Sequence, residues 1–174
     1  MEQIKASIDD LVNEDLKIKE EKYVKAYYSP ELKILGIVWD GIFNKDQYMK
    51  LFDDVLDHAR KHEVKGVYSD IRKQGVVPVE ARKYFEKHVS PESAKLGVGK
   101  TGVVTDASPF KKYYLNTLIK VLGRPAKICS NEQDALDYLL NASFMVTGSK
   151  PETSTAITDG LSAAISRMIC ASSA

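Results

Sequence analysis

Apolar and polar residues alternate along this chain with two different periods, and the change of period predicts where strands give way to helices. Residues 23–28 and 32–39 are rich in aromatic and β-branched side chains, and Ser29-Pro30-Glu31 between them has the composition of a turn. The two runs therefore predict a β-hairpin, which Asp40-Gly41 brings to an end. From residue 44 onward the spacing becomes helical, with a single apolar stripe made of Tyr48, Leu51, Phe52, Val55, Leu56 and Ala59.

Three further strand and helix pairs follow the first helix. Short apolar strands are expected over residues 64–69, 101–105 and 125–129. Helices are expected to begin at Pro78, at Ser108-Pro109 and at Ser130, and Ser90-Pro91 is expected to end the second helix. The order β-β-α-β-α-β-α-β-α predicts an α/β fold. We expect a single-layer, mostly parallel sheet of about five strands, with the antiparallel N-terminal hairpin at its edge and four flanking helices.

The same pattern predicts one domain over residues 22–141 with an additional segment on either side. In the accessory segment 1–21, Ile4, Ile8 and Leu11 recur at helical spacing and predict a short helix that depends on docking. Residues 142–174 form a tail dominated by Ser, Thr and Ala. Within that tail, a run of apolar residues is compatible with a short amphipathic helix: Ile157, Leu161, Ala164, Ile165, Met168 and Ile169.

Charge is distributed unevenly along the sequence. Residues 60–127 contain fifteen Lys or Arg against six Asp or Glu, whereas residues 1–59 contain eight against thirteen. The whole chain of 174 residues has a net charge of only +1, which argues against a general nucleic-acid binder. We therefore expect any surface that attracts anions to come from the middle of the chain.

Sites for disulfides, metals and membrane insertion are not expected. The two cysteines, Cys129 and Cys170, are too few for a disulfide framework, and Cys129 is expected to be a small core residue. His58 and His62 have the spacing of two metal ligands on one helix face, but no third ligand accompanies them. No cofactor motif, signal peptide or membrane span is recognisable, so a soluble, cytoplasmic protein is expected.

Three short motifs resemble those of a known family. They are Trp39-Asp40-Gly41 after the hairpin, Asp70 at the end of a strand, and Ala135-Leu136-Asp137-Tyr138-Leu139 in the last helix. Together with the order of elements over residues 22–141, they resemble the SpoIIAA-like proteins, which share the fold of the STAS domains of bacterial anti-sigma-factor antagonists. The architecture is also similar to that of Sec14-type lipid-binding domains.

The resemblance implies a non-enzymatic module that binds a protein partner or a small ligand. Regulated STAS antagonists carry a phosphorylatable serine at the start of the helix that follows the Asp-terminated strand. Residues 71–78, which occupy that place here, contain no hydroxyl group. A sigma-factor cycle controlled by phosphorylation is therefore not indicated.

Candidate ligand-binding residues follow the predicted parallel strands, because ligands gather at the carboxyl ends of such strands. Besides Asp40, they are Asp70, Arg72, Lys73, Asp106, Ser108, Lys111 and Lys112. An anion there would meet the N-terminus of the third helix and the lysines in its first turn. The alternative is purely structural: Ser108 caps the helix, the lysines are solvated, and the aspartates bond loop amides.

Two functions remain open at this point. The first is a STAS-like regulatory or adaptor module that binds a protein partner, and the second is a carrier or sensor of a small anionic or lipid-like ligand. An enzyme is not expected, because no nucleophile, base and orienting group can be assembled from the sequence. A homodimer is left open. An internal cavity would favour the carrier, and Trp39, at the end of its strand, is expected to anchor the core instead of contacting a ligand.

Overall fold

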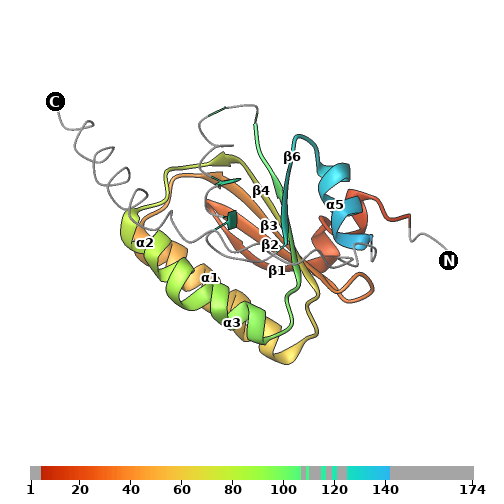
Figure 1. Cartoon of the computed structure of the whole chain (residues 1–174), viewed down its shortest axis with the longest axis horizontal. Coiled ribbons are helices and arrows are strands. Elements are labelled where there is room, and N and C mark those ends of the chain that lie inside the picture. The colour runs from red at the N-terminus through yellow and green to blue at the C-terminus, as the bar shows by residue number, and fades with distance from the viewer. Residues whose placement is uncertain (1–4, 107–108, 110–114, 117–118, 121–124, 142–174) are drawn as a thin grey trace, which may run out of the picture. The chain divides into compact units, whose positions relative to one another are not determined.

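The computed structural model describes residues 5–106, 109, 115–116, 119–120 and 125–141, and its centre is one six-stranded mixed sheet (Figure 1). The strands lie in the order of the sequence: β1 (Lys17–Glu21), β2 (Val24–Ser29), β3 (Ile34–Gly41), β4 (Gly66–Gln74), β5 (Lys100–Val104) and β6 (Ala126–Cys129). Strand β2 is antiparallel to both of its neighbours, β1 and β3, and β3 to β6 are parallel. The predicted fold class, a mostly parallel α/β sheet with an antiparallel N-terminal edge and flanking helices, is confirmed, and the sheet has six strands where about five were expected.

The helices cover both faces of the sheet (Figure 1). On one face lie α1 (Lys45–Lys61), α2 (Val79–Tyr84), a π-helical turn (Phe85–Val89) and α3 (Ser90–Lys95). The other face is covered by α5 (Glu132–Leu140) and a 3-10 turn (Ile8–Asp10). Side chains of β4 alternate between the two faces, with Val67 and Ile71 on the α1 side and Tyr68 on the α5 side.

Side-chain caps fix the starts of α1 and α5. Asn44 accepts a hydrogen bond from the Gln47 amide at 2.9 Å, and the Gln47 side chain accepts one from the Asn44 amide at 2.8 Å. This is the capping box that the sequence indicates. At α5 the cap is Asn131, one residue later than predicted, and its side chain accepts from the Asp134 amide at 2.8 Å.

Two features of the N-terminal part differ from the prediction. Residues 8–10 and 14–16 form 3-10 turns instead of one short helix, and the buried Leu11 between them packs against Gly36, where a Cβ atom would lie 3.3 Å from the leucine side chain. Strand β1 was not predicted because its sequence, KIKEE, lacks an apolar face. It is an edge strand that pairs through its backbone with β2, and its charged side chains protect the open edge.

The predicted helix stop at Ser90-Pro91 is wrong. The helical path continues to Lys95, and the Ser90 amide donates to the carbonyl of Phe85, five residues earlier. Proline lacks an N–H group and crowds the carbonyl four residues before it. The wider π turn directly before Pro91 accommodates this crowding, so the chain keeps its direction instead of breaking.

Strand β4 is longer than predicted and runs on to Gln74. Asp70 therefore does not end the strand; it lies inside it, paired in register with Val38 and Val104. In the part of the chain that the structure describes, no helix is long and apolar enough to cross a membrane. The expectations for residues 142–174 lie outside the described residues.

Candidate ligand cavity

Of the residues predicted from the sequence to bind a ligand, the structure brings Asp70 and Arg72 together. The Asp70 carboxylate is buried and accepts hydrogen bonds from the Arg72 amide at 3.1 Å and from its guanidinium at 2.5 to 3.1 Å. The same guanidinium forms an ion pair with Glu132, the first residue of α5. The hydrogen bonds that the guanidinium donates to Asp70 and then to Glu132 raise the pKa of Arg72 above its ordinary value. Two carboxylates thus hold Arg72, and the trio ties β4 to α5.

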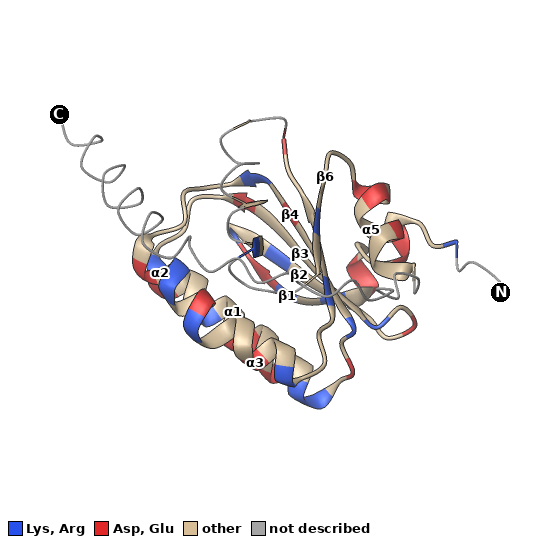
Figure 2. Cartoon of the chain, in the orientation of Figure 1, with Lys and Arg blue, Asp and Glu red and all other residues tan. Residues whose placement is uncertain are grey.

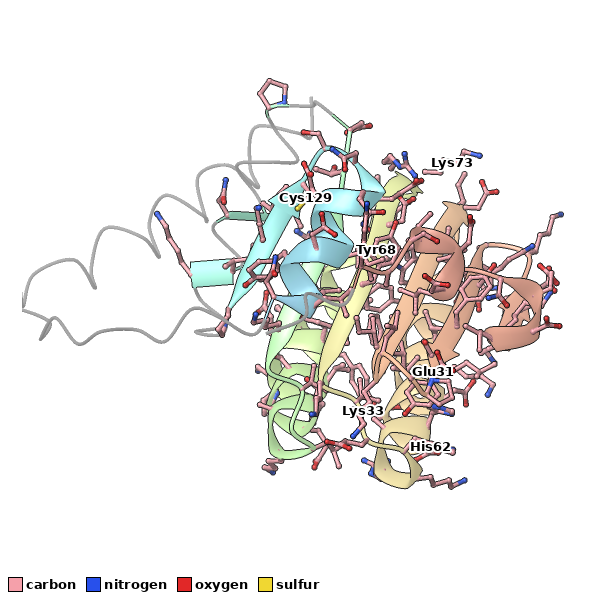
Figure 3. All side chains as sticks on the ribbon, turned by 90° about the vertical axis from the view of Figure 1, so that its right-hand side faces the viewer. Glu31, Lys33, His62, Tyr68, Lys73 and Cys129 are labelled. Carbon is pink, nitrogen blue, oxygen red and sulfur yellow. The ribbon has the colours of Figure 1, made fainter. Side chains whose placement is uncertain are left out.

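Of the remaining predicted residues, the structure describes Lys73 and Asp106. Lys73 is exposed at the far end of the sheet from Lys33 and His62 (Figure 3), and it pairs in register with Asp40. Asp106 is exposed just beyond the end of β5. Ser108, Lys111 and Lys112 lie outside the described residues.

The basic excess of residues 60–127 is partly neutralised within the described chain. Figure 2 shows acidic and basic residues interspersed on the helices that cover one face. Besides Arg72, the described basic residues of this segment with a nearby carboxylate include Arg60 with Asp57 at 2.5 Å, Lys65 with Glu63 at 3.7 Å, and Lys95 with Glu92 at 4.0 Å. Exposed pairs of this kind stabilise a fold little, but they reduce the positive field that a ligand would meet.

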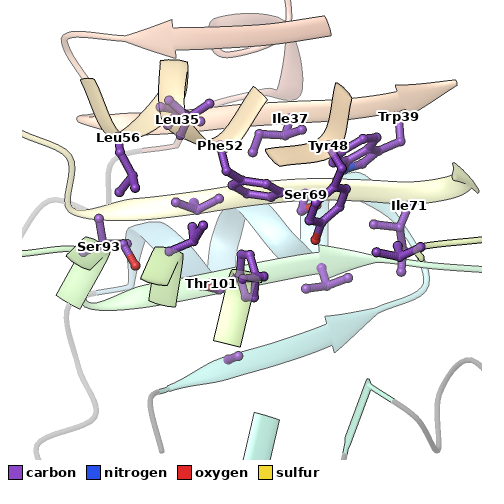
Figure 4. A pocket seen from close by; sticks show the side chains of 18 of the residues that line it. Leu35, Ile37, Trp39, Tyr48, Phe52, Leu56, Ser69, Ile71, Ser93 and Thr101 are labelled. Atoms are coloured by element: carbon purple, nitrogen blue, oxygen red, sulfur yellow. The ribbon is translucent and has the colours of Figure 1, made fainter. Parts of the chain in front are cut away.

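A cavity lies on the opposite face of the sheet from the Asp70–Arg72–Glu132 trio, between the strands and the helices α1 to α3 (Figure 4). Its volume is about 180 Å³. The sheet side is formed by residues that include Ile37, Val67 and Val103, and the helix side by residues that include Phe52, Phe85 and Val89. Leu115 and Ile119, from the segment between β5 and β6, also line it. The lining is therefore mostly apolar.

A minority of the lining residues are polar or charged, and Tyr48 and Gln74 are among them. Ser69 on β4 and Thr101 on β5 are hydroxyl residues of the sheet side, and Ser93 is a hydroxyl residue of the helix side (Figure 4). The Ser93 hydroxyl donates to the carbonyl of Ser90 at 2.9 Å. Arg82 and Glu86 line the cavity four residues apart, the spacing at which opposite charges lie side by side on a helix. Within the described lining, these two are the charged residues, and their formal charges sum to zero.

The helix over the cavity carries the irregular turn. Phe85, Glu86 and Val89 all belong to the π-helical segment, and all three line the cavity. Such turns often occur at functional sites, because the extra residue changes where side chains point. In this chain the π turn contributes three lining residues to the cavity, shortly before Pro91.

Trp39 belongs to an aromatic cluster at one end of the cavity. It is only 2% exposed and stacks on Tyr48 with a centroid distance of 5.3 Å, and Phe43 lies at 4.8 Å. Trp39 is therefore buried, as expected of a residue that anchors the core. Its ring is also part of the cavity wall, so a molecule in the cavity would lie against it.

The histidine and cysteine residues lie elsewhere. His58 and His62 stack on each other with a centroid distance of 4.3 Å, beside Tyr28. Burial, followed by the charge of His62, lowers the pKa of His58. Cys129 is a buried core residue, as predicted, and burial raises the pKa of its thiol. Among the described residues, no three His, Cys, Asp or Glu side chains come together to hold a metal ion.

Comparison of the chain with protein-family models, with curated proteins and with solved structures found no match. The resemblance to the SpoIIAA-like and STAS proteins therefore stays a prediction from the order of elements and three short motifs. The site must be interpreted from its own geometry.

Sequence reasoning missed the cavity because its lining consists of residues that also look like ordinary core. Among the described residues, the strand and helix stripes predicted to face the core are buried or partly buried, and nothing in their spacing shows that they leave a space. Two weak signals were present in the sequence. They are the hydroxyl residues Ser69 and Thr101 inside otherwise apolar strands, and Pro91 within a helical pattern.

Proposed function

We propose that this protein is a non-enzymatic binding module that holds a small, largely apolar ligand between its sheet and the helices α1 to α3. The observation that carries this proposal is the cavity of about 180 Å³ and its mostly apolar lining. Protein interiors are close-packed and contain few voids larger than a water molecule. A void of this size needs an explanation, and a bound ligand provides one.

The size of the cavity limits the ligand. An engineered apolar cavity of about 150 Å³ binds benzene, whereas pockets for drug-sized molecules have about 300–1,000 Å³. A single ring or a short acyl chain therefore fits, and a two-chain phospholipid does not. Among lipid-like ligands, the cavity therefore has room for a molecule with one short acyl chain.

Catalysis is not part of the proposal. The described lining contains Glu86 as its one carboxylate and no His or Cys, and its remaining residues are mostly apolar. A carrier or a sensor needs only the cavity and a way to change shape or affinity when it fills.

The single tryptophan gives a direct test, because Trp39 forms part of the cavity wall. The protein is purified in denaturant and refolded, so that no ligand from the host remains, and its fluorescence is followed during titration with toluene. We expect a saturable change. The matched control is Ile18→Phe on the edge strand β1, which adds a ring outside the cavity and should titrate as the wild type does. A change that rises linearly with toluene concentration would contradict the proposal.

A protein partner is the second candidate function, and one surface favours it. Ile42 and Val76 are 90% and 88% exposed. Their segments touch, since the Gly75 amide donates to the Gly41 carbonyl at 2.9 Å, and Val79 nearby is 49% exposed. Adjoining exposed apolar side chains often mark contact surfaces.

This adaptor function can be tested in the host cell with a photo-crosslinking amino acid at position 42. A discrete adduct with one protein, absent when the same group replaces the exposed Lys61 at the end of α1, would support it. Equal labelling from both positions would count against a partner at this surface.

A further inference from the structure

A hydroxyl residue lies at the centre of the sheet side of the cavity, and the inference drawn from it rests on the proposed function. Ser69 belongs to β4, which has a parallel strand on each side, β3 and β5. It pairs in register with Ile37 of β3 and Val103 of β5, and all three residues line the cavity (Figure 4). A polar side chain therefore lies between two apolar ones in the middle of the sheet.

Ser69 is also the most accessible residue of this row. Ile37 is 1% exposed and Val103 is 8% exposed, whereas Ser69 is partly exposed. Alternate residues of a strand point to the same face, and Val67 and Ile71, two residues before and after Ser69, pack in the core cluster on the α1 side. The accessible surface of Ser69 therefore opens into the space between the sheet and the helices.

The Ser69 hydroxyl is available to a molecule in that space. Within the described part of the chain, no hydrogen bond involves the Ser69 side chain, and its oxygen is not one of the buried polar atoms left without a partner. The Thr101 oxygen is one of those buried atoms, so a ligand in the cavity does not reach it. Of these two hydroxyl groups on the sheet side, that of Ser69 is the one that a ligand can contact.

A ligand can supply the partner that the Ser69 hydroxyl lacks. A hydroxyl group that faces an apolar space interacts favourably only where it finds a hydrogen-bond partner. A serine hydroxyl both donates and accepts, so it pairs with a hydroxyl or a carbonyl group. The apolar part of the same molecule would lie against the wall to which Ile37, Val103 and Phe52 contribute. We infer that the ligand has one ring or a short chain and carries a hydroxyl or carbonyl group that hydrogen-bonds to the Ser69 hydroxyl.

Phenol and toluene test this inference as two probes of nearly equal size, of which only phenol carries a hydroxyl group. Their affinities for refolded, ligand-free protein are measured by titration calorimetry for the wild type, for Ser69→Ala and for Ser29→Ala. We expect Ser69→Ala to bind phenol about fivefold more weakly, the equivalent of one hydrogen bond, and to bind toluene unchanged. Ser29→Ala is the matched control, because Ser29 is a buried serine at the end of β2 outside the described lining. It should bind both probes as the wild type does.

The possible results separate the inference from the proposed function. If toluene binds to the wild type and Ser69→Ala loses no affinity for phenol, the role of the hydroxyl is overturned while the proposed function stands. An equal loss of affinity for both probes in Ser69→Ala also overturns that role, because such a loss would come from the shape of the cavity. If neither probe binds to the wild type, the proposed function fails and the inference fails with it. We expect Ser69→Ala to melt close to the wild type, and a large drop in its melting temperature would show that the hydroxyl has a structural partner, which overturns the inference.

Discussion

Replacing Val67 by phenylalanine should stabilise the free protein and prevent ligand binding, because Val67 lines the cavity from the middle of β4. Cavities destabilise proteins by about 24 cal/mol for each Å³. For a volume of about 180 Å³, this coefficient gives a limit of about 4 kcal/mol for complete filling. A phenyl ring fills only part of the space, so we expect a gain of about 1–2 kcal/mol in the free energy of unfolding.

The assay is denaturant unfolding of refolded, ligand-free protein, together with the toluene titration. A gain of this size corresponds to a rise of roughly 2–8 °C in melting temperature. Val67→Ala is the matched variant in the other direction: it enlarges the cavity, should lose stability, and should still bind toluene. If the space were already filled by side chains, the larger ring would overpack it and Val67→Phe would cost about 1–3 kcal/mol. That result would refute the existence of the cavity.

Three further predictions concern the rest of the fold. Trp39→Ala should cost about 3–5 kcal/mol in the free energy of unfolding, since a buried ring is lost from the aromatic cluster; a cost below about 1 kcal/mol in a urea melt would contradict its role as an anchor. Gly102→Ala should lower the free energy of unfolding by about 1–3 kcal/mol, because a Cβ atom there would lie 2.9 Å from the carbonyl oxygen of Ala135. Gly99→Ala is the neutral control, because its Cβ atom would lie 3.8 Å from the nearest atom. Burial lowers the pKa of His58 in the folded state below the unfolded value of about 6.5. The free energy of unfolding therefore keeps its full value above the unfolded pKa and decreases as the pH falls from there through the lower folded-state pKa. Unfolding measured from pH 7.5 to 5 should accordingly show a shallower loss of stability in His58→Gln than in the wild type, and identical slopes would contradict the argument.

The fold was largely predictable because it depends on periodic patterns. The stripe of α1 from Tyr48 to Leu56 and the capping box at Asn44 are local signals, and the structure agrees with both. Strand β1 was not predictable in this way. Its polar sequence has no apolar period, and it exists because the open edge of β2 offers backbone partners.

The second helix shows how a correct local rule can fail. Proline normally ends a helix, and Pro91 still has no amide to donate. Apolar side chains on both sides of it, Val89 before and Leu96 after, pack against the same core cluster. This packing favours a continuous helix, and a π turn relieves the steric conflict.

The cavity residues were not among those predicted to bind a ligand, for a different reason. The expectation for Asp70 and Arg72 assumed that β4 ends at Asp70, and it took charge as the sign of a ligand. In the structure the two charges satisfy each other on the α5 side of the sheet. A cavity is a property of how elements fit together in three dimensions, and a sequence pattern that shows burial does not show unfilled volume.

The central claim, that the space between the sheet and α1 to α3 takes up a small apolar molecule, is tested most directly by methyl NMR during a toluene titration. We expect saturable chemical-shift changes at methyl groups of the lining, such as those of Ile37, Val67 and Val103. Methyl groups on the other face, such as those of Val104 and Leu136, should not shift. Shifts that do not saturate, or that affect both faces alike, would contradict the claim.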